Sequence, residues 1–283
     1  MTLLLLRAGK LAVDLAPLAG GSIARFSVDG ADILRPMTAA DVASGKGNNA
    51  AAYPLVPFSN RIANGRFEFD GKPIAVPPNW PGLRHPMHGD GWSARWHVDH
   101  ANDNSAMLAY VHDGRTGWPF RYRTSFDFHL TEQGLSVSMI LENLEPHTVP
   151  AGMGLHPFFV REPDTELAFK AEAVWLGDAE VLPTERVAVP SNWSFARRRR
   201  PDVALDNCFD GWDRRVTVVW PSRRCRLELV ATQLFGQLVV YTPPDRPFFC
   251  VEPVSHANGA IGQTRLAAGA ILSGAMVFTI SDL

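Results

Sequence analysis

Apolar and polar residues alternate along much of the chain. This two-residue period places apolar side chains on one face of a β-strand and polar side chains on the other. It covers residues 11–15, 23–28, 67–69, 74–76, 126–130, 135–141, 216–220, 225–230, 238–242 and 276–280. Asp70-Gly71 lies between two such segments and favours a tight hairpin, because a primed turn needs positive φ. The sequence therefore predicts many short antiparallel strands.

Helix signals are few. Residues 39–44 and 232–236 are each predicted to hold a turn or two of helix, and no long amphipathic helix is expected. No charge block, low-complexity tract or fixed-period repeat marks a linker or a solenoid. We therefore expect an all-β chain, folded as one large antiparallel β-sandwich with few short helices, and a single domain over residues 1–283.

Composition and charge exclude several classes of protein. The 27 Lys and Arg residues nearly balance the 29 Asp and Glu residues, which leaves no electrostatic footprint for nucleic acid. No stretch approaches the roughly 20 apolar residues of a membrane span, and Arg7 and Lys10 interrupt the opening leucines. The 3 cysteines have no CxxC spacing and indicate neither a disulfide framework nor a zinc knuckle. We expect a cytoplasmic protein that binds neither membrane nor nucleic acid.

Several ionisable residues stand among apolar neighbours. His156 follows Gly-Met-Gly-Leu and precedes Pro-Phe-Phe, while Glu252 lies in Phe-Phe-Cys-Val-Glu-Pro. Because an unpaired buried carboxylate is unfavourable, Glu252 must either face solvent or be satisfied in a site. His85 and His88 are three residues apart in a segment whose Pro and Gly residues favour a loop over a helix. Each of these residues is weak evidence on its own.

Four arginines follow one another at positions 197–200. Guanidinium groups match phosphate oxygens in a bidentate manner, so the run could hold a phosphate. The surrounding chain is neutral or acidic, which favours a solvated loop instead. We assign the run no catalytic role.

Taken together and in order, these segments resemble the aldose 1-epimerase, or galactose mutarotase, family. The resemblance spans about residues 10–280 and rests on Pro57-Phe58-Ser59-Asn60-Arg61-Ile62, Gly65-Arg66-Phe67, His88-Gly89, His156-Pro157-Phe158-Phe159, Leu205-Asp206 and Val251-Glu252-Pro253. It implies a large β-sandwich, the galactose mutarotase-like supersandwich, whose groove holds a sugar. It also implies an isomerase that interconverts the α and β anomers of a free aldose as a monomer or homodimer, with no metal and no organic cofactor.

The resemblance also assigns roles to individual residues. Glu252 matches the general base, His156 the acid that serves the ring oxygen, and His88 the second active-site histidine. Arg61 and Asp206 match residues that hold sugar hydroxyls, and the neighbouring Asn60 is expected to bind substrate as well. His85 is an extra imidazole beside the motif, and we favour His88 as the one that faces the ligand because Gly89 follows it.

Opening a cyclic hemiacetal removes a proton from the C1 hydroxyl and delivers one to the ring oxygen. A carboxylate with a pKa near about 4.3 and a histidine near about 6.5 suit these tasks at neutral pH. After the C1–C2 bond rotates, the same two groups act in reverse, so no covalent intermediate and no Ser or Cys nucleophile is needed.

Other functions remain open at this stage. A glucose-6-phosphate 1-epimerase-like enzyme would use the same acid and base on an anionic sugar held by arginines, including those at 197–200. A non-catalytic carbohydrate-binding protein would bind without turnover. His88, His156 and Glu252 could instead form a two-histidine, one-carboxylate iron site, and Asp206 with Glu252 could be the carboxyl pair of a glycosidase.

Overall fold

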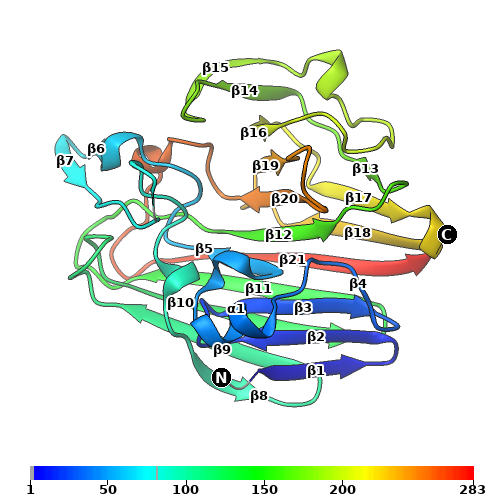
Figure 1. Ribbon diagram of the computed structural model, residues 1–283. Helices are drawn as coiled ribbons and strands as arrows, with labels where there is room; N and C mark the ends of the chain where they lie inside the picture. The colour runs from blue at the N-terminus through cyan, green and yellow to red at the C-terminus, as the bar shows by residue number, and fades with distance from the viewer. Residues whose placement is uncertain (1–2, 81) are drawn as a thin grey trace.

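The computed structural model describes residues 3–80 and 82–283, and antiparallel strands make up nearly all of the regular secondary structure (Figure 1). One sheet has 11 strands in the order β1-β2-β3-β5-β12-β20-β19-β16-β14-β15, with β4 pairing with β3. These strands are β1 (Leu4–Ala8), β2 (Leu11–Ala16), β3 (Ser22–Val28), β4 (Ala31–Asp32), β5 (Ala52–Leu55), β12 (Gly154–Val160), β14 (Ala173–Gly177), β15 (Pro183–Ala188), β16 (Asp206–Asp210), β19 (Gln237–Tyr241) and β20 (Phe248–Val254). The predicted all-β, antiparallel fold class is confirmed.

A second sheet of 8 strands has the order β13-β17-β18-β21-β11-β10-β9-β8, and β6 pairs separately with β7. These strands are β6 (Arg66–Phe69), β7 (Lys72–Ala75), β8 (His97–Ala101), β9 (Ser105–His112), β10 (Tyr122–Thr131), β11 (Gly134–Asn143), β13 (Glu166–Ala168), β17 (Arg215–Trp220), β18 (Cys225–Ala231) and β21 (Ile271–Asp282). Short 3₁₀ turns occupy Gly47–Asn49, Ala63–Gly65, Gly91–Ser93, Ser191–Trp193, Pro221–Arg223 and Ile261–Gln263. None of the helices within the described ranges has the length and apolar character that crossing a membrane requires.

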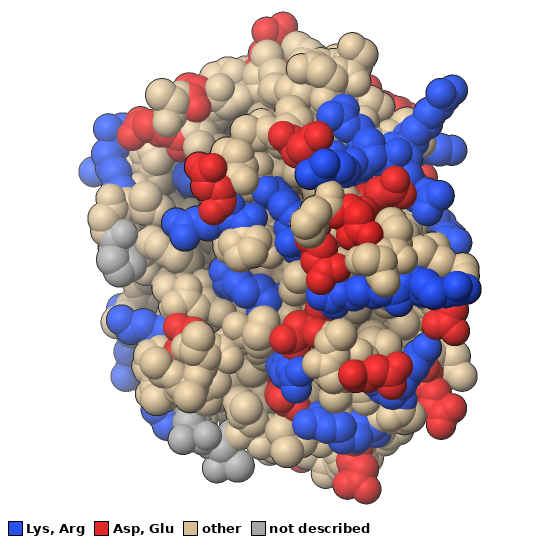
Figure 2. Space-filling view, turned by 45° about the vertical axis from the view of Figure 1, so that its right-hand side comes forward, with Lys and Arg blue, Asp and Glu red and all other residues tan. Residues whose placement is uncertain are grey.

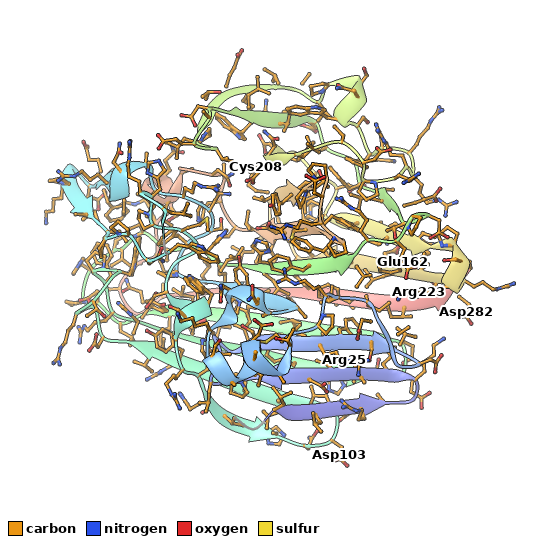
Figure 3. The ribbon with its side chains drawn as sticks, in the orientation of Figure 1. Arg25, Asp103, Glu162, Cys208, Arg223 and Asp282 are labelled. Carbon is orange, nitrogen blue, oxygen red and sulfur yellow. The ribbon has the colours of Figure 1, made fainter. Side chains whose placement is uncertain are left out.

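The core lies between the two large sheets. Strands β1 and β2 contact β10, so the first sheet covers the inner face of the second, as Figure 1 shows for the blue and green strands. Apolar side chains from both sheets are fully buried there, and Phe26 of β3 meets Phe278 of β21 edge to face at 6.4 Å. At one end, Arg223 from the second sheet pairs with Glu162 just after β12, and both are labelled in Figure 3. The sandwich thus gives β12 and β20 a rigid support on one side.

Local sequence signals account for the turns. Asp70 and Gly71 adopt φ of +50° and +70°, as the predicted β6–β7 hairpin requires. The predicted helix at 39–44 is α1 (Ala39–Ser44), with Thr38 as N-cap and Gly45 in the left-handed conformation after its last residue.

The helix expected at 232–236 is absent from the described structure, so that prediction was wrong. Thr232 exchanges backbone and side-chain hydrogen bonds with Ala275 of β21, and the amide of Phe235 donates back to the carbonyl of Thr232. One tight turn therefore links β18 to β19, because the segment is held by the neighbouring strand and by the buried Phe235 ring.

The face of the 11-stranded sheet that points away from the core carries the polar residues of interest. On β20, Phe249 and Val251 point into the inter-sheet core, so Phe248, Cys250 and Glu252 must point to the opposite face. The register of β12, β20, β19 and β16 aligns these side chains in rows across the sheet. One row runs Tyr53, His156, Glu252, Val239, Cys208, and the next runs Phe158, Cys250, Tyr241, Asp206.

Candidate active site

A cavity of about 400 Å³ lies over these two rows. Its volume is within the range usual for small-molecule sites. The residues that line it are Arg35, Asn48, Asn49, Tyr53, Asn60, Arg61, Trp80, Met87, His88, His156, Phe158, Asp206, Val239, Tyr241, Arg246, Phe248 and Glu252. All six residues expected at a sugar site, namely Asn60, Arg61, His88, His156, Asp206 and Glu252, are among them.

His156 and Glu252 lie next to each other on the floor of this pocket. They project from the adjacent strands β12 and β20, and Nε2 of His156 is 3.2 Å from Oε1 of Glu252. Both side chains are almost completely buried. The imidazole stacks on the ring of Phe158 at 4.5 Å and packs on Tyr53 at 4.6 Å, so its plane is fixed by aromatic neighbours.

Burial sets the protonation of this pair. Burial raises the pKa of Glu252 well above its usual value, and the nearby charge of Asp206 raises it further. Burial lowers the pKa of His156 well below its usual value, with smaller contributions from His88 and Arg35. Since a net charge is unfavourable there, the two side chains together hold one dissociable proton. The pair can thus supply a proton at one atom while accepting one at another.

The pair has few other partners. Within residues 3–80 and 82–283, the structure gives the carboxylate of Glu252 no hydrogen bond, and Nδ1 of His156 is buried without a hydrogen-bond partner. Buried polar groups in proteins are almost always satisfied. The free hydrogen-bonding capacity of Glu252 at the pocket wall is therefore available to a ligand.

His88 contributes a neutral imidazole that contacts His156 and Tyr53. The backbone N–H of Asn60 donates to Nδ1 of His88 at 3.1 Å, which requires the ring proton to be on Nε2. Burial, together with the charge of Arg61, lowers the pKa of His88 to about 3. The ring lies edge-on to His156 at 5.3 Å. His88 is thus a hydrogen-bond donor to the pocket and does not carry a positive charge.

The backbone around His88 depends on the following glycine. His88 and Gly89 have φ of +63° and +68°, and a Cβ on Gly89 would lie 1.9 Å from the carbonyl oxygen of Val56. His85 is also buried, but its Nδ1 accepts the amide of Asn64 and it does not line the cavity. Of the two histidines in this segment, the structure places His88 at the pocket.

Arg61 and Asp206 face each other across the pocket wall. Nη1 of Arg61 is 3.9 Å from Oδ2 of Asp206, a loose contact that leaves both groups free to bind hydroxyls. Burial raises the pKa of Asp206, and the Arg61 charge partly opposes that effect. The carbonyl oxygen of the Asn60 side chain accepts the amide of Arg61 at 2.8 Å and fixes the turn that presents Arg61.

The pocket also contains residues that the sequence did not single out. They are Arg35, Asn48, Asn49, Tyr53, Trp80, Met87, Val239, Tyr241, Arg246 and Phe248. Trp80 packs on Trp92 at 4.5 Å and offers an aromatic surface for the apolar face of a ring. An aromatic side chain in a loop rich in Pro and Gly was the available signal for Trp80.

The four arginines at 197–200 lie outside this pocket. Arg198 pairs with Glu166, Arg199 pairs with Asp202, and Arg200 lines a separate, smaller cavity. Figure 2 shows the same mixture over one face of the molecule, where positive and negative side chains are interspersed. This placement agrees with the interpretation of the run as a solvated loop, and the run does not line the pocket described above.

The possible metal ligands differ from the set of His88, His156 and Glu252 considered for an iron site. In the described part of the chain, the group with ligand spacing is His156, Cys250 and Glu252, whose ligand atoms lie within 4.8 Å of one another. His88 does not belong to this group. Burial raises the pKa of the Cys250 thiol well above its usual value, which favours the protonated form over a thiolate ligand.

Comparisons with known proteins agree with this geometry. A model of the aldose 1-epimerase family matches residues 2–279. The uncharacterised protein YphB of Escherichia coli K12 is 32% identical over 266 residues, which cover 91% of this chain and 89% of YphB. The aldose 1-epimerase of the same organism is 26% identical over 137 residues, covering 47% of this chain and 38% of that enzyme.

Solved structures show the same similarity in three dimensions. A candidate aldose 1-epimerase from Escherichia coli K12, determined at 1.59 Å resolution, is 30% identical and has a TM-score of 0.91, covering 100% of this chain and 99% of its own. A galactose mutarotase-like protein from Clostridium acetobutylicum is 17% identical and has a TM-score of 0.84, covering 99% and 95%. This chain therefore has the galactose mutarotase-like fold and belongs to the aldose 1-epimerase family.

Proposed function

We propose that this protein is an aldose 1-epimerase, which interconverts the α and β anomers of a reducing aldose by acid–base ring opening and closure. The observation that carries the proposal is the pair of His156 and Glu252, 3.2 Å apart on the floor of a pocket that Arg61, His88 and Asp206 also line. A donor and an acceptor at one locus match the two proton transfers that a hemiacetal needs.

The reactive form has the proton of the pair on His156 and an ionised Glu252. Glu252 then accepts the proton of the C1 hydroxyl while His156 delivers its proton to the ring oxygen, as the bond between C1 and that oxygen breaks. The product is an open-chain aldehyde, which turns about the C1–C2 bond. The two side chains then transfer their protons in reverse and close the ring on either face. Proton balance holds because the pair gives one proton and receives one in each direction.

The surrounding residues bind and orient the sugar. Nε2–H of His88 donates to an oxygen near the reacting centre, and Arg61 with Asp206 holds hydroxyls through charge-assisted hydrogen bonds. Trp80 covers the apolar C–H face of the ring. Because these contacts fix one orientation, the acid and the base meet the correct oxygens.

Polarimetry on freshly dissolved α-glucose and α-galactose tests this function. We expect the optical rotation to relax faster than in buffer, in proportion to enzyme concentration. A carbohydrate-binding protein without catalysis would bind the sugars in a calorimeter and leave the relaxation rate of every aldose unchanged, and that result would contradict the proposal.

A further inference from the structure

Two positively charged side chains in the pocket have no carboxylate partner. Arg35 and Arg246 both line the cavity, and neither forms an ion pair with any acidic residue of the described ranges. By contrast, Arg61 in the same pocket faces Asp206, and Arg25 near the pocket's strands is paired with Asp32. Water can solvate the exposed Arg246, whereas the guanidinium of Arg35 is partly buried, so its lack of a carboxylate partner needs another explanation.

Arg35 is held in a fixed position. Its guanidinium carbon lies 4.0 Å from the centre of the Phe158 ring and 4.7 Å from that of Phe248. The one hydrogen bond that the structure gives its side chain runs from Nη2 to the carbonyl of Ala50 at 3.0 Å. A stacked guanidinium loses little further freedom when it binds an oxyanion, because its planar group is already oriented.

The environment of Arg35 leaves its charge only partly compensated. Burial lowers its pKa, and the charge of Arg246 lowers it further. The carboxylate of Asp41 partly offsets this charge and raises the pKa of Arg35. The oxygens of Asp41, however, already accept hydrogen bonds from Thr38 and Asn49. The positive charges of Arg35 and Arg246, which line the same pocket, repel each other, and a bound anion would offset this repulsion.

The register of Phe158 and Phe248, the rings that Arg35 contacts, places Arg35 beyond the reacting pair. His156 and Glu252 lie in one row, Phe158 and Cys250 in the next, and Phe248 two residues further along β20. Successive rows on one face are separated by about 7 Å. His156 stacks on Phe158 as well, and two planar groups cannot share one face of a ring, so the phenyl ring separates the imidazole from Arg35. The distance from the acid–base pair to Arg35 is comparable with the length of a hexose.

We propose that the pocket selects aldoses that carry an anionic substituent at the end of the sugar remote from C1, with Arg35 and Arg246 binding that substituent. Phosphate, sulfonate and carboxylate share the required chemistry, because all three present oxygens that guanidinium groups bind in a bidentate manner. Asn48 and Tyr241, on the same wall, add neutral donors. This inference rests on the proposed mutarotase function and narrows its substrate class.

Anomer exchange on matched sugars tests the inference. Glucose, glucose 6-phosphate, glucuronate and 6-deoxy-6-sulfoglucose are compared at pH 8, each corrected for its own uncatalysed rate. We expect kcat/KM to be at least tenfold higher for one or more of the anionic sugars than for glucose, and the three anions separate a phosphate, sulfonate or carboxylate preference. Equal or lower kcat/KM on all three would overturn the inference and leave the mutarotase proposal intact.

Matched variants distinguish a specific anion-binding site from a general effect of the protein's positive charge. Arg35→Gln and Arg246→Gln should each reduce the ratio of anionic to neutral kcat/KM at least fivefold. Arg197→Gln removes the same charge from an exposed position outside the pocket and should leave the ratio unchanged. Arg246 is on an exposed loop, so its variant remains informative if Arg35→Gln does not fold. A ratio that is unchanged in both variants would contradict the assignment.

A binding measurement keeps the two proposals distinguishable. If no sugar is turned over, the proposed function fails. Calorimetry with glucose 6-phosphate and glucuronate then still measures the affinity of the proposed anion-binding site. Binding that weakens at least fivefold in Arg246→Gln supports an anion-binding site in the pocket. Binding no tighter than that of glucose overturns it.

Discussion

Two buried histidines of this protein, His112 and His156, each lie beside a carboxylate, and the two pairs have opposite surroundings. In one, Nδ1 of His112 lies 2.6 Å from Oδ2 of Asp90, and the hydroxyls of Tyr110 and Tyr122 also donate to that carboxylate. The other ring nitrogen of His112 donates to the carbonyl of Trp118 at 2.7 Å. Every ring nitrogen and carboxylate oxygen in this first pair therefore has a protein partner.

The pair of His156 and Glu252 lacks such partners, although both histidines are buried and Glu252, at 3% exposed, is more buried than Asp90 at 21%. Burial lowers the pKa of His112, but the hydrogen bond and the charge of Asp90, together with the carbonyl of Trp118 and the charge of Asp113, more than offset this, so the pKa is raised. For His156 burial prevails and the pKa is lowered. The difference teaches that burial alone does not mark a catalytic histidine. What distinguishes the pocket pair is hydrogen-bonding capacity that the protein leaves unused beside a cavity.

The largest expected effect is on catalysis by the pocket pair. His156→Gln removes the proton donor while keeping a side chain of similar polarity, so kcat for mutarotation should fall by about 10² to 10⁴. KM should change much less, because hydroxyl-binding residues such as Arg61 are untouched. Stopped-flow polarimetry measures both constants. A kcat within threefold of wild type would remove His156 from the acid role.

Breaking the fully satisfied pair should affect stability. Asp90→Asn removes the charge that His112 and two tyrosine hydroxyls contact, and we expect the free energy of unfolding to fall by about 3 kcal/mol. Urea denaturation measures this change. Tyr122→Phe, which removes one donor to Asp90, should lower stability by less, and an Asp90→Asn protein as stable as wild type would contradict the comparison.

A smaller catalytic effect is expected at His88. His88→Asn suits the positive φ of +63° but shortens the side chain, so its donor no longer reaches the bound sugar. The loss of one such hydrogen bond should reduce kcat by about tenfold to a hundredfold. Because His88 is neutral, the reduction should be the same at pH 6 and pH 8. A reduction confined to one pH would show that His88 carries a titrating proton in catalysis.

The smallest expected effect is a pH dependence of stability. The pKa of His112 in the folded protein is above its usual value of about 6.5, so folded protein binds more protons than unfolded protein between these two values. Its contribution is fully present below about pH 6.5 and is lost as pH rises through the folded pKa. Urea denaturation across this window should show wild type losing stability relative to His112→Gln. Parallel curves for the two proteins would contradict the assignment.

Local patterns predicted much of the fold. The alternation in 126–130 and 135–141 and the Asp70-Gly71 dipeptide act over a few residues, so they determine β10, β11 and the β6–β7 hairpin without reference to distant parts of the chain. The segment 232–236 was predicted incorrectly because its hydrogen bonds are to β21, which is remote in the sequence.

The site divides in the same way. The residues that resemble a known family were identified from their motifs, and the structure brings all six to one pocket. Arg35 and Arg246 lie in loops without such motifs. The significance of Arg35 depends on its contacts with the Phe158 and Phe248 rings, and that of both arginines on the lack of acidic partners among the described residues. The pairing of β12 with β20 creates this environment, and no local pattern encodes that register.

The mutarotation rate of Glu252→Gln, compared with that of Asp90→Asn at equal concentrations of folded protein, tests the central claim most directly. The account predicts that Glu252→Gln loses at least a hundredfold in kcat and that Asp90→Asn, once folded, keeps its rate within threefold of wild type. A Glu252→Gln protein that turns over sugar at a rate near wild type would contradict the account, as would an equal loss in both variants.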